Sequence, residues 1–181
     1  MLNRRNNRAG RPAGRGFTLI EAALATVIVG TGVLAIMFAQ QTFHRQNDWA
    51  ERSATAMRLA GEIREMTINL PRHDPVTGAE VWGPEPNESL LEDWDDVDDF
   101  QNAVFSADLG NGPVSALRDV LPQFPGWSQR VEVANVDPFD ISTVLPNGEG
   151  SMLRVRVGVF YQGPMDTEPL EITNLTWIQP R

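Results

Sequence analysis

Residues 16–39 read GFTLIEAALATVIVGTGVLAIMFA, an apolar run in which Glu21 is the only charged residue. From Phe17 to Ala39 a helix would be about 35 Å long, which is enough to cross a hydrocarbon core of about 30 Å. Five arginines and no acid precede the run. Such a basic segment tends to stay in the cytoplasm. The sequence therefore predicts one membrane-spanning helix, with the residues after Gln40 on the far side of the membrane.

Glu21 is the residue of this run that needs an explanation. A charged side chain near the middle of a bilayer costs about 2.5 to 3.5 kcal/mol on insertion scales, so it is normally retained where a partner cation awaits it. We therefore expect Glu21 to have a cationic partner.

The junction between the basic segment and the apolar run resembles a known processing motif. It reads Arg15-Gly16-Phe17-Thr18-Leu19-Ile20-Glu21, and it is similar to the N-terminal motif of type IV pilins and of the pseudopilins of type II secretion systems. The resemblance implies that a prepilin peptidase cleaves between Gly16 and Phe17 and N-methylates Phe17. It also implies that Glu21 meets the terminal ammonium of a neighbouring subunit as the filament grows, which would supply the missing cation.

Beyond the span, residues 40–70 predict an amphipathic stalk helix that continues the first one. No helix breaker occurs before Leu70-Pro71, where the residue before proline is pushed out of helical geometry. Apolar residues recur at spacings of three or four, with Arg and Glu between them, and we expect the far half of the helix to bury this stripe under a sheet. The stripe consists of Phe43, Ala50, Ala54, Met57, Ala60, Ile63 and Met66.

Residues 71–126 predict an acidic, irregular connection with one or two short helices. Within it, residues 90–100 read LLEDWDDVDDF. Here Leu91, Trp94, Val97 and Phe100 lie three apart, as in a short helix that presses this stripe onto the core and leaves its carboxylates in solvent.

A calcium site is the alternative interpretation of the same stretch. Calcium takes six to eight oxygen ligands, and closely spaced acids repel one another unless a cation neutralises them. The stretch is also similar to Asp-Asp-Val-Asp-Asp-aromatic sequences in minor pilins of the mannose-sensitive haemagglutinin type. The candidate ligands are Asp93, Asp95, Asp96, Asp98 and Asp99.

Residues 127–181 predict the antiparallel sheet of the head. Apolar and polar residues alternate from Trp127 to Val136, from Leu153 to Tyr161 and from Leu170 to Ile178, as in half-buried strands. Gly and Pro in residues 163–169 favour a hairpin loop, and residues 137–150 form a longer link. The expected fold class is α+β: a long N-terminal helix packed on a small antiparallel sheet, like that of type IV pilins.

Composition excludes several classes of function. From Phe17 onward the chain has ten arginines, no lysine and twenty-four acidic residues. This net negative charge repels the phosphate backbone of nucleic acids, so no nucleic-acid partner is expected. Without cysteine there is no disulfide, thiolate metal site or cysteine nucleophile. His44 and His73 are interpreted as exposed or structural residues. No catalytic residues can be assigned, so we expect no enzyme, and no cofactor apart from the calcium alternative.

These observations favour a structural subunit of a type IV pilus or a type II secretion pseudopilus, and a minor subunit over the abundant one. The resemblance implies three partners: prepilin peptidase, other pilin or pseudopilin subunits, and an inner-membrane assembly platform. It places the chain in the bacterial inner membrane, with a cytoplasmic N-terminus and a periplasmic head, and then in the filament. The alternative is a membrane-anchored periplasmic binding domain that never polymerises and keeps its leader, residues 1–16.

Overall fold

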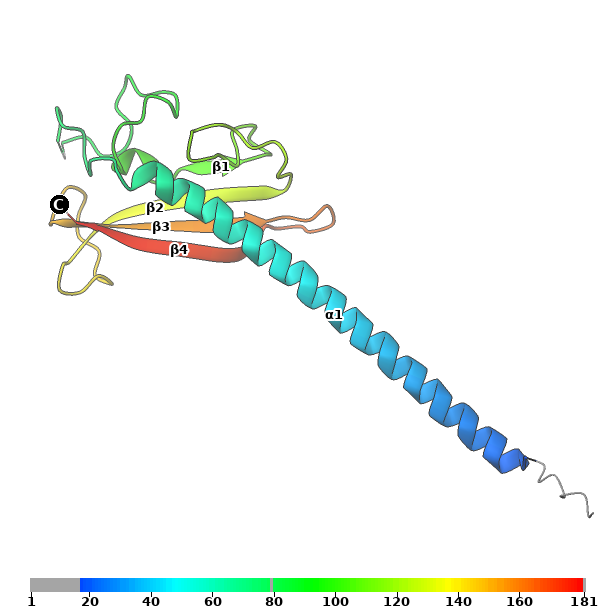
Figure 1. The fold of residues 1–181 in the computed structure, drawn as a ribbon. Helices are drawn as coiled ribbons and strands as arrows, with labels where there is room; N and C mark the ends of the chain where they lie inside the picture. The colour runs from blue at the N-terminus through cyan, green and yellow to red at the C-terminus, as the bar shows by residue number, and fades with distance from the viewer. Residues whose placement is uncertain (1–16, 79, 181) are drawn as a thin grey trace, which may run out of the picture. The chain divides into compact units, whose positions relative to one another are not determined.

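The computed structural model describes residues 17–78 and 80–180 (Figure 1). It confirms the α+β class, with one long apolar N-terminal helix and one four-stranded antiparallel sheet. Contacts divide the chain into two compact units, residues 1–47 and 48–181, and the long helix contributes to both. The elements are α1 (Leu19–Thr67), the 3-10 turn η1 (Asp98–Phe100), β1 (Val104–Ser106), β2 (Trp127–Val136), β3 (Met152–Tyr161) and β4 (Leu170–Pro180).

In the first unit, the described chain is helical from Leu19 onward and every described residue is exposed. The hydroxyls of Thr26 and Thr31 donate to the carbonyls four residues earlier, at 2.8 Å to Ala22 and 3.0 Å to Val27. These hydroxyls are therefore satisfied within the helix. By length and composition, α1 could cross a membrane.

In the second unit, the last turns of α1 pack their apolar face on the core. Ala60, Ile63 and Met66 are buried there, as the sequence predicted. Ala54 and Met57 are exposed, which corrects the predicted stripe, and Ala56 and Leu59 are buried instead. The reason is geometric: a step of three residues turns the helix by about 300°, so a series spaced by three drifts about 60° per step away from the core face.

The sheet is a meander with the order β1-β2-β3-β4, and all neighbours are antiparallel. The three predicted strands are confirmed as β2, β3 and β4, with loops at the expected places. The register pairs Val133 with Val155 and Val155 with Trp177, so the inward-facing residues of the three strands lie side by side. In Figure 1 the last turns of α1 lie across this sheet.

Strand β1 was not predicted, because three residues are too few to show the alternation of apolar and polar side chains that indicates a strand. It pairs with the first half of β2, for instance Phe105 with Gln129. The Gln129 side chain is completely buried. Its amide donates to the carbonyls of Leu59 (2.8 Å) and Val114 (3.1 Å), and its oxygen accepts from the amide N–H of Val114 (2.7 Å). This one side chain therefore joins α1, the connection and the sheet.

The connection forms turns rather than the short helix predicted over residues 90–100. Within that stretch only η1 is helical. The stripe itself is confirmed, because Val97 and Phe100 are fully buried while Leu91 and Trp94 pack against the core. The expected solvent exposure of the acids is wrong for Asp96, Asp98 and Asp99, which are 1% exposed. Aspartate side chains that bind nearby backbone amides compete with helix formation.

Candidate functional site

The first turn of α1 holds Glu21 in a capping box with Thr18. The Glu21 Oε2 accepts hydrogen bonds from the Thr18 backbone N–H and from the Thr18 hydroxyl, both at 3.0 Å. In return the Thr18 Oγ1 accepts from the Glu21 N–H at 3.3 Å. This reciprocal Thr-x-x-Glu arrangement satisfies amides that a helix leaves unpaired at its start. Thr18 and Glu21 thus define where α1 begins.

The capping box gives Glu21 neutral partners but no countercharge. Both hydrogen bonds that its carboxylate accepts use Oε2, and among the described residues Oε1 has none. The position also suits a negative charge, because the N-terminal end of a helix carries partial positive charge. Phe17, the residue next to the predicted cleavage, is 79% exposed, whereas Gly16 lies outside the described residues.

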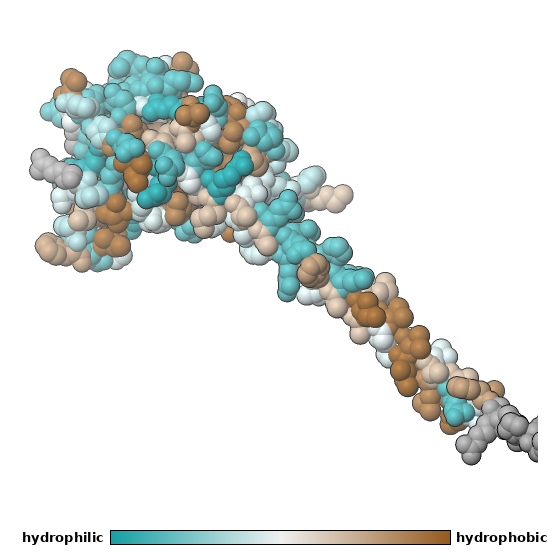
Figure 2. Space-filling view, in the orientation of Figure 1, coloured by the Kyte–Doolittle hydropathy of each residue, from teal (hydrophilic) through white to brown (hydrophobic). Residues whose placement is uncertain are grey.

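The surface that follows Glu21 is apolar on every side. Figure 2 shows hydrophobic side chains covering most of the N-terminal half of α1. A water-exposed apolar surface of this extent is unfavourable, so it marks a surface that lipid or another protein covers. The large apolar residues that are at least half exposed include Leu24, Val27, Ile28, Val29, Val33, Leu34, Ile36, Met37 and Phe38.

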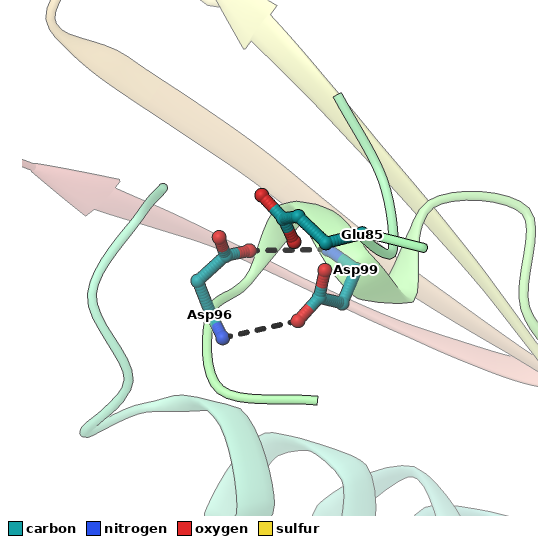
Figure 3. A group of neighbouring side chains, drawn as sticks. All are labelled: Glu85, Asp96 and Asp99. Carbon is teal, nitrogen blue, oxygen red and sulfur yellow. Dashed lines mark hydrogen bonds between the residues drawn. The ribbon is translucent and has the colours of Figure 1, made fainter. Parts of the chain in front are cut away.

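A second feature lies in the connection, where three buried carboxylates come together (Figure 3). One oxygen each from Glu85, Asp96 and Asp99 lies within 4.8 Å of the others. Glu85 comes from the loop after Gly83, and the two aspartates flank the start of η1. Segments more than ten residues apart in the chain therefore supply one group of acidic oxygens.

Asp96 and Asp99 hold each other in place through the backbone. The Asp96 Oδ1 accepts from the N–H of Asp99 at 3.2 Å, and the Asp99 Oδ2 accepts from the N–H of Asp96 at 3.2 Å (Figure 3). The Asp99 Oδ2 also accepts from the Asp95 N–H at 3.0 Å, and the Asp96 Oδ1 from the Asp98 N–H at 2.8 Å. These bonds fix the direction in which both side chains point.

Two oxygens of these residues are buried and have no hydrogen-bond partner among the residues that the structure describes: the Glu85 Oε2 and the Asp99 Oδ1. The other oxygen of Glu85 is occupied, because its Oε1 accepts from the Thr77 hydroxyl at 2.7 Å. Buried polar atoms are nearly always paired with protein, water or an ion, since leaving a buried charged group unpaired costs several kcal/mol. Among the described residues of the connection, these are the buried carboxylate oxygens that lack a partner and could bind a ligand.

A second group shares Asp99: one oxygen each from Glu88, Asp95 and Asp99 also lies within 4.8 Å of the others. Glu88 is buried and its Oε2 accepts from the Glu85 N–H at 3.1 Å, whereas Asp95 is exposed. The cluster therefore extends from buried residues to solvent. We call Glu85, Glu88, Asp95, Asp96 and Asp99 the acidic cluster.

Burial and mutual repulsion disfavour the charged forms of these acids. Burial raises the pKa of Asp96 to about 8, and the hydrogen-bonded Asp98 carboxylate adds to the effect. Burial likewise raises the pKa of Glu88 to about 7, with contributions from Glu85 and Asp99, and that of Asp99 to about 6. A carboxyl is expected to lose its proton more readily when a cation lies beside it.

Asp98 is buried next to the acidic cluster but points elsewhere. Its Oδ1 lies 2.8 Å from the His73 Nδ1, and its Oδ2 accepts from the Gly83 N–H at 3.2 Å. His73 also packs on the Trp82 ring, with centroids 5.6 Å apart, and burial lowers its pKa. The interpretation of His73 as structural agrees with these contacts. His44 is exposed on α1.

The structure places the five predicted calcium ligands differently from one another. The acidic cluster contains three of them: Asp95, Asp96 and Asp99. Asp98 instead contacts His73. Asp93 is exposed and accepts a hydrogen bond from the Leu90 N–H at 3.3 Å. Sequence reasoning missed Glu85 and Glu88. They stand alone in a Pro-rich loop, Pro84-Glu85-Pro86-Asn87-Glu88, which has no metal-ligand spacing of its own.

Comparison of the chain with protein-family models, with curated proteins and with solved structures found no match in any of the three. The function of this chain is therefore inferred from three features of its own structure: the start of α1, the exposed apolar surface of that helix, and the acidic cluster.

Proposed function

We propose that this chain is a structural subunit, of the minor class, of a type IV pilus or a type II secretion pseudopilus. It is cleaved after Gly16, N-methylated at Phe17 and assembled through α1. The observation that carries the proposal is the helix start: the first half of α1 is apolar and exposed, and its first turn holds one carboxylate that has no countercharge among the described residues.

Assembly then proceeds by exchange of lipid for protein around α1. Between helices in a membrane, association depends on close packing and on polar contacts, because lipid and leucine are equally apolar. The ammonium created at Phe17 by cleavage is a cation that a neighbouring subunit brings to the Glu21 Oε1. In a medium of low dielectric such a pair is much stronger than in water, so it sets the axial register between subunits.

The partners and location follow from this role. Prepilin peptidase processes the chain, an inner-membrane platform assembles it, and other pilin or pseudopilin subunits surround α1. The leader is cytoplasmic, the second unit is periplasmic, and no nucleic acid is bound. The missing cysteines and the acidic connection favour the minor class.

The second candidate is a membrane-anchored periplasmic binding domain that keeps its leader and does not polymerise. The capping box favours it, because the hydrogen bonds between Thr18 and Glu21 give this carboxylate a role in starting the helix that needs no neighbour. In that case the charge of Glu21 has no separate role.

The intact mass of the chain extracted from the native membrane distinguishes the two candidates. Processing removes residues 1–16 and adds one methyl group to Phe17, so we expect the mass of residues 17–181 plus a methyl. The control is the Gly16→Leu variant, which should retain the leader because the motif that this junction resembles has Gly before the cut. A native chain that still carries its first sixteen residues would exclude the filament proposal.

A further inference from the structure

We infer that the acidic cluster is a Ca²⁺ site that joins the Glu85 loop to the segment around η1. This inference concerns the second unit and does not depend on the proposed assembly of α1. It rests on the grouping of oxygens from separate segments and on two buried oxygens that find no partner in the described part of the chain.

The donor set selects the class of ion. All of the ligands are carboxylate oxygens, which suit Ca²⁺ and Mg²⁺ rather than metals that prefer nitrogen or sulfur. Two oxygens bound to one Ca²⁺ at about 2.3–2.6 Å can lie up to about 5 Å apart. The spacing in both groups, within 4.8 Å, fits that limit. Mg²⁺ demands near-ideal octahedral geometry and sheds its waters reluctantly, so ligands from irregular loops favour Ca²⁺.

Hydrogen bonds within the protein already hold the carboxylate side chains of the proposed calcium site in place. The backbone amides hold one oxygen of Asp96 and one of Asp99, and the Thr77 hydroxyl holds one oxygen of Glu85. The Glu85 Oε2 and the Asp99 Oδ1 are left buried, with no hydrogen-bond partner among the described residues. Those are the two atoms that an ion would bind first.

The second group completes the coordination and provides access. Asp99 belongs to both groups, so Glu88 and Asp95 can contribute oxygens to an ion near Asp99. Asp95 is exposed, so the ion and its remaining water ligands can reach the site from solvent. Calcium takes six to eight oxygen ligands, and three carboxylates that each give one oxygen do not supply that number.

The ion would stabilise a segment that has few other constraints. Between α1 and β1 the only regular element among residues 68–78 and 80–103 is η1, and the chain has no cysteine with which to cross-link this segment. A divalent cation offsets the repulsion among the buried acids and ties residues 85–88 to residues 95–99. We expect the folded state to bind the ion and the unfolded state to bind it weakly, so calcium should raise the melting temperature.

The experiment is a calcium titration of the full-length chain, purified in a nonionic detergent after treatment with a chelator. Isothermal calorimetry should give a Kd of about 0.01–1 mM, the range between sensor and extracellular sites. At a concentration 100-fold above that Kd the melting temperature should rise by about 10 °C. No heat of binding and an unchanged melting temperature at millimolar Ca²⁺ would overturn the inference. An equal response to Mg²⁺ would contradict its assignment to calcium.

Two matched pairs of variants locate the site. Asp99→Asn and Glu85→Gln keep the shape and one acceptor oxygen but remove the charge, and each should weaken calcium binding at least tenfold. Asp93→Asn and Glu92→Gln change exposed acids outside the cluster and should bind as the wild type does. In chelator, Asp99→Asn should be at least as stable as the wild type, because a buried carboxylate is gone. Wild-type affinity in both cluster variants would refute the location, even if one variant folds poorly.

Discussion

In the first turn of α1, the Glu21 carboxylate is a hydrogen-bond acceptor for Thr18 and also the one charged group of the apolar run over residues 16–39. The two properties belong to the same side chain, but they have different chemical requirements. Capping needs an oxygen acceptor at this position, which glutamine also provides. Pairing with a neighbour's ammonium needs the negative charge.

A pair of substitutions at this turn separates capping from charge. Glu21→Gln keeps the acceptor and should abolish incorporation into filaments, because the neutral amide cannot compensate the ammonium of Phe17. Thr18→Ala loses the hydroxyl contacts, should cost about 1 kcal/mol of helix stability and should still be incorporated. Sheared filaments and membrane fractions, compared by immunoblot against the wild type, provide the measurement.

The processing of these two variants serves as the control, since both should still be cleaved after Gly16. If Glu21→Gln is incorporated normally while Thr18→Ala is not, the role of Glu21 is capping and the register mechanism is wrong.

At the scale of elements, the two halves of α1 differ in which of their faces are buried. Up to Asn47 it is exposed all round, whereas its last turns bury only the face that carries Ala56, Leu59 and Ile63. The apolar residues that remain exposed after Asp48, such as Met57, contribute nothing to this core. Stability of the second unit should therefore depend on helix face rather than on hydrophobicity alone.

Alanine substitutions on the two faces test this. Ile63→Ala removes a fully buried side chain and leaves a cavity, so it should lower the free energy of unfolding by about 2–5 kcal/mol. Met57→Ala, at a position 51% exposed, should change it by less than about 0.5 kcal/mol. Urea denaturation of the detergent-solubilised chain, followed by tryptophan fluorescence, measures both. Equal losses in the two variants would contradict the assignment of the core face.

At the scale of the whole molecule, the two units carry different features. Residues 17–47 supply the exposed apolar helix and Glu21, and residues 48–180 supply the hydrophobic core and the acidic cluster. Sites that share no partner usually contribute independently to stability and binding. Assembly and calcium binding should therefore be separable by mutation.

A variant defective in assembly tests this separation. Glu21→Gln should bind calcium with a Kd within about twofold of the wild-type value, because none of its contacts involves the acidic cluster. The calcium titration described above, repeated on this variant, is the measurement. A shift of tenfold or more would show that the two units are coupled.

The sequence by itself determined the features that are encoded locally along the chain. A run of apolar residues specifies the first half of α1, and alternation specifies β2, β3 and β4. Each of these patterns is read within about twenty residues, because helical and strand periodicity are properties of neighbouring residues. The α+β class follows from them.

Only the tertiary structure decided which distant residues meet. The Gln129 side chain joins three segments, and Glu85 enters the acidic cluster from a loop that has no pattern of its own. In the connection the aspartates bind backbone amides, so periodic apolar residues pack on the core without forming a helix. Burial of a polar group depends on what the rest of the chain places around it, and that is settled only when the chain has folded.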